Sequence, residues 1–358
     1  MNYTAGQLFQ TLVEQNGSDL HIAVGSPPRV RIDGQLVPLQ LPPIEPAKAG
    51  EICYTVMNEE QRKIFEQNNE IDFSFEIKNL ARFRANIYVS SGNVAGAFRL
   101  VPSKIFSIDE LGLPKIVKTV CDATKGLVLV TGATGSGKST TLAAMVDYIN
   151  SNRYDHIITL EDPVEFVHTH KKCLIHQREV GSDSSSFKVA LKSILRQDPD
   201  IVLLGELRDR NSIGSAITIA ETGHIVLATL HTNSCVDSVN RIVDSFPGDE
   251  QSQIRAQLSA SLKAVFSQQL IPAVPNGRAL ALEIMMVTSG IRSLILEGKT
   301  NQIYSQLQIG QAETGMQTMN QSLAKLAVSG QISKKDAMKY SSDVDELQNY
   351  IAKYGSIS

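Results

Sequence analysis

The stretch GLVLVTGATGSGKSTTLAAMVDYIN occupies residues 126–150. It begins with a continuous apolar run, which is typical of a buried strand, and from residue 140 onward it has the composition of a helix. Between the two, GATGSGKS (132–139) matches the phosphate-binding pattern GxxxxGK[ST], which requires this strand–loop–helix context. We therefore predict an α/β domain that binds a nucleotide at this loop.

The residues of this loop have separate expected tasks. Backbone N–H groups at the positive end of the following helix bind the β-phosphate, and the glycines let the chain curl around it. Lys138 places a cation against the β- and γ-phosphate oxygens, and the Ser139 hydroxyl completes the ligand shell of a Mg²⁺ ion. ATP and Mg²⁺ are thus the expected ligands. The predicted binding set is Gly132, Thr134, Gly135, Ser136, Gly137, Lys138, Ser139 and Thr140.

Length and composition narrow the class of protein. The 358 residues are enough for about two domains. A content of 42% hydrophobic and 20% charged residues is typical of a globular protein. The 34 basic and 37 acidic residues give a formal charge of −3, which argues against a nucleic-acid binder. The four cysteines are dispersed without a CxxC pair, which argues against zinc and a disulfide framework and fits a reducing compartment.

Targeting segments are not indicated. No stretch approaches 18 uncharged apolar residues, and the first fifteen residues lack a basic region followed by an apolar run. We therefore expect a cytoplasmic protein.

The first 100 residues alternate between short strand and helix patterns, which indicates an α+β domain. Asp33-Gly34 between two apolar runs predicts a hairpin, and Asn58 predicts a helix N-cap. The expected strands are 19–24, 28–32, 35–39, 72–77, 81–90 and 93–101, and the expected helices are 46–57 and 58–68.

After a linker at 101–124, the pattern changes. The runs GLVLVTG, HIITLED, DIVLLGE and HIVLATLH are continuously apolar and end in polar residues, as strands of a parallel sheet covered on both faces do. We expect an ATPase core at 125–290 and a helical region at 291–358. Helices are predicted at 249–270, 288–298, 316–329 and 333–354.

Carboxylates follow two of these strands. Glu206 lies just past DIVLLG, where it can hold a Mg²⁺-bound or attacking water. LEDPVEF offers Glu161, Asp162 and Glu165 after another strand. One of these three carboxylates is a candidate general base, but the spacing does not decide which one. The other two are equally well explained as capping or ion-pair residues.

Histidines bracket a third strand, IVLATL. His231 is the better candidate for sensing the γ-phosphate, because it stands at the carboxyl end of the strand, whereas His224 stands at the other end. The segment VHTHKKCLIH (167–176) contains three histidines and a cysteine, but its spacing fits no standard zinc site, so we read it as a polar connection.

Four boxes in order resemble one family, the PilT-type secretion ATPases that retract type IV pili. They are GATGSGKS, ITLEDPVEF, IVLLGELRD and ETGHIVLATLHT, and the similarity extends from SDLHIAVGSPPRVRIDG near the start to GQISKKDA near the end. The resemblance implies a PAS-like N-terminal α+β domain, a RecA-like P-loop ATPase domain with a helical C-terminal extension, and a homohexameric ring.

The resemblance also implies roles for particular residues. It favours Glu165 as the catalytic carboxylate, with Glu206 beside the Mg²⁺ and His231 reading the γ-phosphate, and leaves Glu161 as a further candidate. It implies that arginines of the N-terminal domain reach the nucleotide, which here are Arg82, Arg84 and Arg99. Cations at that place stabilise charge on the transferred phosphoryl group, although solvated arginines on a surface strand would have the same pattern.

The implied activity is ATP hydrolysis that drives pilin disassembly, and hence twitching motility. The implied partners are an inner-membrane platform protein (PilC-like) and other pilus ATPases, at the inner face of the cytoplasmic membrane.

One segment departs from the family pattern AIRNLIRE. Residues 290–297 read GIRSLILE, with Ser293 and Leu296 in place of Asn and the second Arg. An accessory PilU-like ATPase therefore stays an alternative. Pilus assembly and type II secretion ATPases share the boxes but carry a longer N-terminal region and usually a four-cysteine loop, which this sequence does not show. A nucleic-acid translocase and a non-hydrolysing ATP-dependent clamp are the remaining alternatives.

Overall fold

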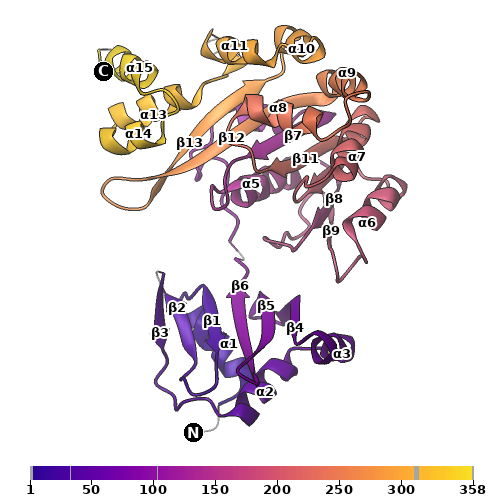
Figure 1. Cartoon of the computed structure of the whole chain (residues 1–358), viewed down its shortest axis with the longest axis vertical. Coiled ribbons are helices and arrows are strands. Elements are labelled where there is room, and N and C mark those ends of the chain that lie inside the picture. The colour runs from indigo at the N-terminus through magenta and orange to yellow at the C-terminus, as the bar shows by residue number, and fades with distance from the viewer. Residues whose placement is uncertain (1–2, 33, 103, 310–313, 357–358) are drawn as a thin grey trace. The chain divides into compact units, whose positions relative to one another are not determined.

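The computed structural model describes residues 3–32, 34–102, 104–309 and 314–356. Contacts divide the chain into two compact units, the first made of Met1–Lys104 and Glu165–Val167, the second of Ile105–Val164 and His168–Ser358. Figure 1 shows both units with their helices and strands labelled. Among the described residues, no helix is both long and apolar enough to cross a membrane.

The first unit is an α+β domain, as predicted. Its described strands form one six-stranded antiparallel sheet in the order β3-β2-β1-β6-β5-β4. The elements are α1 (Ala5–Glu14), β1 (Asp19–Ile22), β2 (Arg29–Ile32), β3 (Gln35–Pro38), α2 (Pro46–Thr55), α3 (Glu59–Asn68), β4 (Glu70–Ile77), β5 (Ala81–Ser90) and β6 (Asn93–Leu100).

Local signals explain much of this unit. Asn58 caps α3, because its Oδ1 accepts from the Gln61 N–H at 2.8 Å while Gln61 Oε1 accepts from the Asn58 N–H at 2.9 Å. Strands β2 and β3 pair antiparallel, and Gly34 between them has φ +83°; Asp33 lies outside the described residues. Helix α1, which was not predicted, packs its buried Phe9 against Phe83 with ring centroids 4.8 Å apart.

The second unit is built on a predominantly parallel sheet, which confirms the predicted α/β class. The strand order is β13-β12-β7-β11-β10-β8-β9, with β13 antiparallel to its neighbour. The strands are β7 (Gly126–Thr131), β8 (His156–Glu161), β9 (Leu174–Glu179), β10 (Ile201–Leu204), β11 (Ile225–Leu230), β12 (Leu262–Pro272) and β13 (Arg278–Met286).

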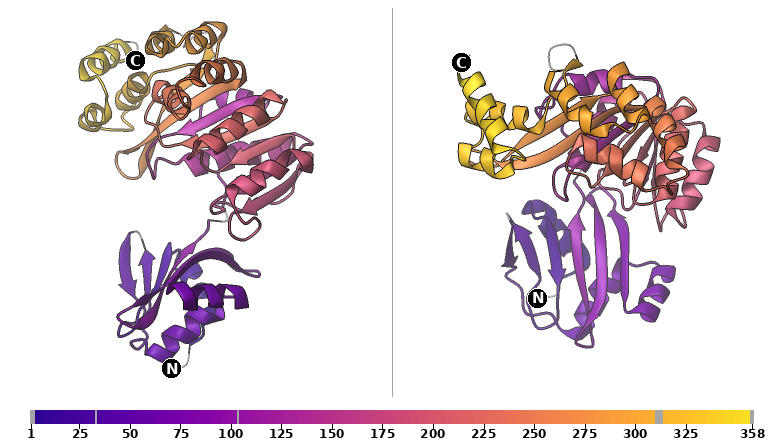
Figure 2. Two further views of the ribbon diagram at one scale, coloured as in Figure 1. Left: turned by 45° about the vertical axis from the view of Figure 1, so that its right-hand side comes forward. Right: turned by 45° about the horizontal axis from the view of Figure 1, so that its top comes forward.

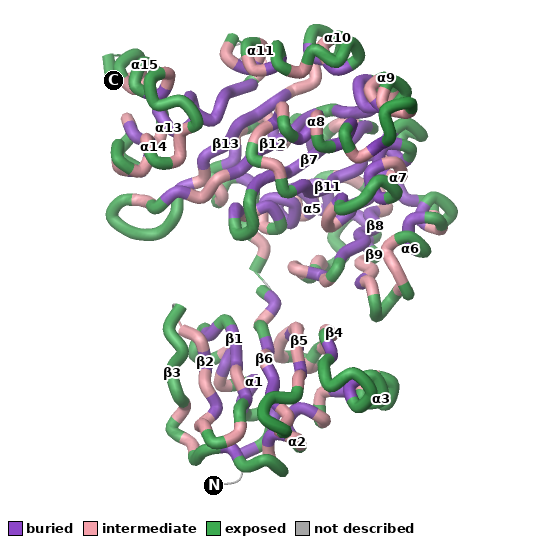
Figure 3. The backbone as a smooth tube through the Cα atoms, viewed as in Figure 1, coloured by how far each residue is buried: buried purple, intermediate pink, exposed green. Residues whose placement is uncertain are grey.

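Helices cover this sheet on both faces. Along β7, Leu127 and Leu129 join the core beneath α7, α8 and α9, while Val128 and Val130 join the core beneath α4 and α5. In Figure 3, the residues of β7 and β11 at the centre of the unit are coloured as buried. The helices are α4 (Ile116–Cys121), α5 (Lys138–Asn152), α6 (Phe187–Ile194), α7 (Arg210–Glu221), α8 (Cys235–Asp244) and α9 (Gln251–Ser261).

Two predictions for this unit are wrong. The helix expected at 249–270 ends at Ser261, and the chain continues as β12, because Leu262 to Ser267 pair in parallel with β7 and complete its open side. The polar connection expected at 167–176 ends at Cys173, after which Leu174 begins β9, an edge strand paired with β8. In both places pairing with another strand determines the conformation.

The chain ends in a group of helices. They are α10 (Ser289–Leu296), α11 (Ile303–Ile309), α13 (Met319–Val328), α14 (Lys334–Tyr340) and α15 (Val344–Gly355), so the helix expected at 333–354 is interrupted. The interruption falls at Ser341, whose ψ of 141° is extended, and Asp343 starts the next helix by accepting from the Glu346 N–H. Helices α13 to α15 gather beside β13 (Figure 2).

Candidate active site

The phosphate loop leaves the end of β7 and enters α5. Gly132 has φ +139°, and a Cβ there would lie 2.4 Å from the Gln268 carbonyl oxygen and 2.6 Å from Ser136 Oγ. Only glycine therefore fits at this position without a shift of the backbone. Gly137 has φ +91° and precedes α5, so the chain turns sharply before the helix begins. The loop places the amino end of a 15-residue helix beside these glycines.

Lys138 is a buried cation in this loop. Its Nζ donates to the carbonyl oxygens of Gly132 at 2.8 Å and Ala133 at 3.0 Å. Burial lowers the pKa of Lys138, and the negative charge of Glu206 counteracts that effect. Ser136 is 6% exposed, and its Oγ has no hydrogen-bond partner among the described residues. A desolvated ammonium beside an unsatisfied hydroxyl suits a ligand rich in anionic oxygens.

Glu206, His231 and Arg208 form a cluster at the same edge of the sheet. Since β7, β10 and β11 are parallel, their carboxyl ends meet there. His231 Nε2 lies 3.4 Å from Glu206 Oε1, and Arg208 Nε donates to Glu206 Oε2 at 2.9 Å. This hydrogen bond and the charge of Glu206 raise the pKa of Arg208. Arg208 Nη1 also lies 3.7 Å from Asp162 Oδ2.

The carboxylates after β8 are placed differently from one another. Glu161 is 9% exposed, and its Oε1 accepts from Thr159 Oγ1 at 2.7 Å and from Gln177 Nε2 at 3.2 Å. Glu161, the last residue of β8, is therefore held by its own strand and by the neighbouring strand β9. Glu165 belongs to the short stretch 165–167, whose contacts group it with the first unit.

The three arginines lie in the first unit. Arg82 and Arg84 are on β5, and Arg99 on β6 is the register partner of Arg84. Arg99 Nε donates to Asp19 Oδ1 at 2.8 Å. Although burial tends to raise the pKa of Asp19, hydrogen bonds from Ser18 and Arg99 hold it below its usual range.

Sequence reasoning missed several residues that support the site. Arg208 lies within the motif IVLLGELRD, but the pattern alone assigns it no role. Gln268 Nε2 donates to Thr141 Oγ1 at 2.7 Å and so fixes the first turns of α5. Ser238 Oγ lies 2.7 Å from Thr232 Oγ1 and 3.5 Å from Thr131 Oγ1, which ties the segment after His231 to the start of the phosphate loop.

The remaining histidines lie elsewhere. His224 Nδ1 lies 3.1 Å from Ile219 O, at the opposite end of β11 from His231. Burial lowers the pKa of His168 to about 4. His176 Nδ1 lies 2.8 Å from His156 Nε2. No group of three or more His, Cys, Asp and Glu side chains is placed to hold a metal ion within the part of the chain that the structure describes.

Together, the doubly covered parallel sheet, the strand–loop–helix around Lys138, and the carboxylate–histidine pair at the strand ends define a P-loop ATPase domain. The family model for the type II/IV secretion system protein matches residues 4–339. This chain belongs to that family.

Individual relatives are similar over nearly the whole chain. The type IV pilus retraction ATPase PilT of Pseudomonas aeruginosa is 49% identical over 331 residues, which cover 92% of this chain and 96% of that protein. The P. aeruginosa pilus ATPase PilU is 40% identical over 353 residues, covering 98% of this chain and 92% of that protein. A crystal structure of the pilus retraction motor PilT with bound ADP matches with a TM-score of 0.92 and 45% identity, covering 97% of this chain and 100% of that one.

Proposed function

We propose that this protein is an ATP-hydrolysing motor that powers retraction of type IV pili. The observation that carries the proposal is the meeting of the Lys138 loop with Glu206 and His231 at one sheet edge, in a chain 49% identical to a pilus retraction ATPase. Retraction would follow from coupling each ATP turnover to a change in the motor that releases pilin from the fibre base, at an inner-membrane platform protein.

In the proposed reaction, a water oxygen bonds to the γ-phosphorus while the bond to the β–γ bridging oxygen breaks, and ADP and phosphate leave. Glu165 accepts the proton of the attacking water, and Lys138 with Arg82, Arg84 and Arg99 neutralises charge on the phosphoryl oxygens. His231 contacts the γ-phosphate. Glu161 stays a second candidate for the base.

Ser139 and Glu206 would hold Mg²⁺, since hydroxyl and carboxylate oxygens are the ligands that Mg²⁺ prefers. When bound, the ion supplies positive charge to the β- and γ-phosphate oxygens. The Glu206 oxygens are already contacted by Arg208 and His231, which favours contact through a water.

A homohexameric ring working with other pilus ATPases is part of the proposal. An accessory role like that of PilU is the second candidate, because PilU aligns with 98% of this chain and because α10 carries Leu296, 52% exposed, where the retraction pattern has an arginine.

Two measurements test the proposal. We expect Lys138→Ala to abolish ATP turnover, because the substitution removes the cation of the phosphate loop; retained turnover would contradict the assignment of this site. Lys335→Gln, on the exposed surface of α14, serves as the matched control and should keep full activity.

Whether the motor drives retraction rather than assembly of the pilus is tested in a bacterium that lacks its own retraction ATPase. Restored twitching by this gene alone supports the retraction motor. Restoration only when a second retraction ATPase is present supports the accessory role. Restored pilus assembly in a strain that instead lacks its assembly ATPase, without restored twitching in the first strain, would overturn both.

A further inference from the structure

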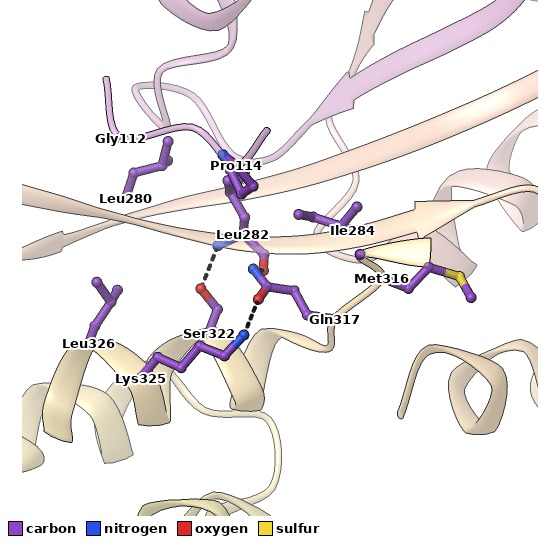
Figure 4. Close-up of a pocket in the computed structure, with 11 residues that line it drawn as sticks. Gly112, Pro114, Leu280, Leu282, Ile284, Met316, Gln317, Ser322, Lys325 and Leu326 are labelled. Carbon is purple, nitrogen blue, oxygen red and sulfur yellow. Dashed lines mark hydrogen bonds between the residues drawn. The ribbon is translucent and has the colours of Figure 1, made fainter. Parts of the chain in front are cut away.

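A pocket of about 610 Å³ lies between β13 and α13, but its groups are already engaged by the chain itself. Lys325 Nζ donates to Gln317 Oε1 at 3.0 Å, and Ser322 Oγ accepts from the Leu282 N–H at 3.0 Å (Figure 4). On the wall of the pocket, Leu282 is 3% and Ile284 is 0% exposed. We therefore assign no ligand to this pocket.

Two histidines meet at the edge of the sheet opposite β13. His156 is the first residue of β8, and His176 lies on β9, the edge strand that pairs with β8 (Figure 1). His156 Nε2 lies 2.8 Å from His176 Nδ1. Because 20 residues separate the two histidines in the chain, the spacing within residues 167–176 does not reveal this pair.

The other ring nitrogen of His156 shows which nitrogen carries the hydrogen. His156 Nδ1 lies 2.8 Å from Asp198 O. A carbonyl oxygen only accepts hydrogen bonds, so the hydrogen is on Nδ1, and the neutral ring has its lone pair on Nε2. Histidines that bind metal ions are typically held by such a hydrogen bond from the ring nitrogen that does not contact the ion. His156 therefore already has the tautomer and orientation of a metal ligand.

The distance between the two ring nitrogens fits one class of ion. Two nitrogens that bind the same ion at about 2.0 Å and at right angles lie about 2.8 Å apart, whereas tetrahedral coordination separates them by about 3.3 Å. Right angles occur in the square-planar and tetragonal geometries of Ni²⁺ and Cu²⁺. His176 has only to move its hydrogen from Nδ1 to Nε2, where water can accept it because this side chain is exposed.

The surroundings leave room for an ion and its water ligands. A pocket of about 430 Å³ is lined by both histidines and by Ile158, Gln177, Arg178, Asp183 and Gln197. A water molecule takes up about 30 Å³ in the liquid, so several fit. Arg178 and Asp183 carry opposite charges, and their effects on a bound cation therefore oppose each other. Two protein nitrogens with water in the other positions describe an exchangeable site rather than a closed structural one.

We propose that His156 Nε2 and His176 Nδ1 together bind a divalent transition-metal ion of the nickel and copper type, with water in its remaining positions. The ion replaces the hydrogen bond between the two rings and links the edge strand β9 to β8. The unfolded chain does not hold the rings together, so binding stabilises the folded state. Mg²⁺ prefers oxygen ligands and is not expected at this pair of nitrogens.

Isothermal titration calorimetry of the full chain tests this assignment, without nucleotide or affinity tag and with excess Mg²⁺ to occupy oxygen sites. We expect one Ni²⁺ to bind per chain. His176→Gln should weaken this binding at least tenfold, because one imidazole cannot chelate the ion, and the variant should fold because His176 is exposed. His224→Gln is the matched control, since His224 Nδ1 also lies beside a backbone carbonyl, Ile219 O at 3.1 Å, but on another strand. It should leave Ni²⁺ binding unchanged.

The electron paramagnetic resonance spectrum of bound Cu²⁺ gives an independent test. We expect hyperfine coupling to two imidazole nitrogens in the unaltered protein and to one in His176→Gln. The proposal is overturned if Ni²⁺ does not bind, if His176→Gln binds Ni²⁺ as tightly as the unaltered protein does, or if His224→Gln weakens binding equally. Coupling of Cu²⁺ to a single nitrogen in the unaltered protein would also overturn it.

Discussion

At the scale of single residues, the site depends on backbone positions as much as on charged groups. Gly132 combines φ +139° with the close approach of the Gln268 carbonyl, so its lack of a side chain is a steric requirement. The pattern GxxxxGK[ST] predicts this glycine, because the pattern encodes the loop geometry. It does not predict Gln268, which lies on a strand 136 residues later and meets the loop only in the folded chain.

We predict that Gly132→Ala lowers nucleotide affinity at least tenfold. The added Cβ would lie 2.4 Å from a backbone oxygen, and the loop must move to relieve the contact. Binding of a fluorescent ATP analogue measures the effect. Gly223→Ala is the matched control, since Gly223 also has positive φ (+105°) but open space around it; it should cost roughly 1 kcal/mol of stability and leave affinity unchanged. Equal affinities of the two variants would contradict this account.

Among the residues at the carboxyl edge of the sheet, some could also be predicted from the sequence and others could not. Glu206 and His231 were identified because each directly follows an apolar run, and parallel strands bring their carboxyl ends together. Arg208, which contacts Glu206 at 2.9 Å, was not identified, since nothing in the chain pattern says that its side chain turns back toward the carboxylate two residues before it.

At the scale of elements, α8 is held at its start by a residue from another strand. Glu283 of β13 is 3% exposed, and its Oε1 accepts from the N–H of Cys235, the first residue of α8, at 2.7 Å. This segment directly follows His231, so the contact fixes where the chain leaves the candidate site. A carboxylate at a helix N-terminus is also stabilised by the helix dipole.

We predict that Glu283→Ala destabilises the protein by about 1 to 3 kcal/mol, because the buried Cys235 N–H loses its acceptor. Glu283→Gln keeps an acceptor oxygen and should cost less. Chemical denaturation followed by circular dichroism measures both, with the exposed Glu297→Gln as control. A Glu283→Ala variant as stable as the control would show that this contact does not hold α8.

The pH dependence of Glu283 follows from its burial, which raises the pKa of its carboxyl above the ordinary value of 4.5. A raised pKa in the folded state means that the folded protein binds the proton more tightly than the unfolded chain. The resulting stability is fully present below pH 4.5 and is lost as pH rises through the folded-state pKa. Relative to Glu283→Gln, the unaltered protein should therefore lose free energy of unfolding as pH rises above 4.5; a difference independent of pH would contradict this.

The elements that were predicted wrongly share a physical cause. The sequence LKAVFSQQL (262–270) has no turn signal separating it from α9, and its apolar spacing suits a helix face as well as a strand. Its conformation is decided by pairing with β7, which lies far away in the chain. Strands β7, β10 and β11 were predictable because their apolar runs are bounded by polar residues and glycine.

At the scale of the whole molecule, the groups assigned to catalysis come from both units. Lys138, Glu206 and His231 belong to the second unit, whereas Arg84 and Arg99 belong to the first. The sequence resemblance predicted both sets, but the chain pattern alone could not say whether one subunit completes its own site. If the protein forms the proposed ring, we expect the arginines to act on the nucleotide of a neighbouring subunit.

That arrangement predicts that ATP turnover per subunit rises with protein concentration, because dilution separates the arginines from the nucleotide that they serve. Steady-state phosphate release across a dilution series measures it. Glu165→Gln is the control, and we expect it to bind nucleotide while remaining inactive at every concentration, since it lacks the proposed base.

Mixing two inactive variants gives the sharper form of this prediction. Lys138→Ala lacks a functional phosphate loop but keeps its arginines, and Arg84→Ala keeps its phosphate loop but lacks one arginine. In a mixed ring, a Lys138→Ala subunit supplies Arg84 to the intact phosphate loop of its neighbour, so turnover should recover to a fraction of that of the unaltered protein. If each subunit instead completes its own site, the mixture stays as inactive as its components, because neither variant then contains a complete set of groups. In that case the specific activity of the unaltered protein also does not depend on its concentration.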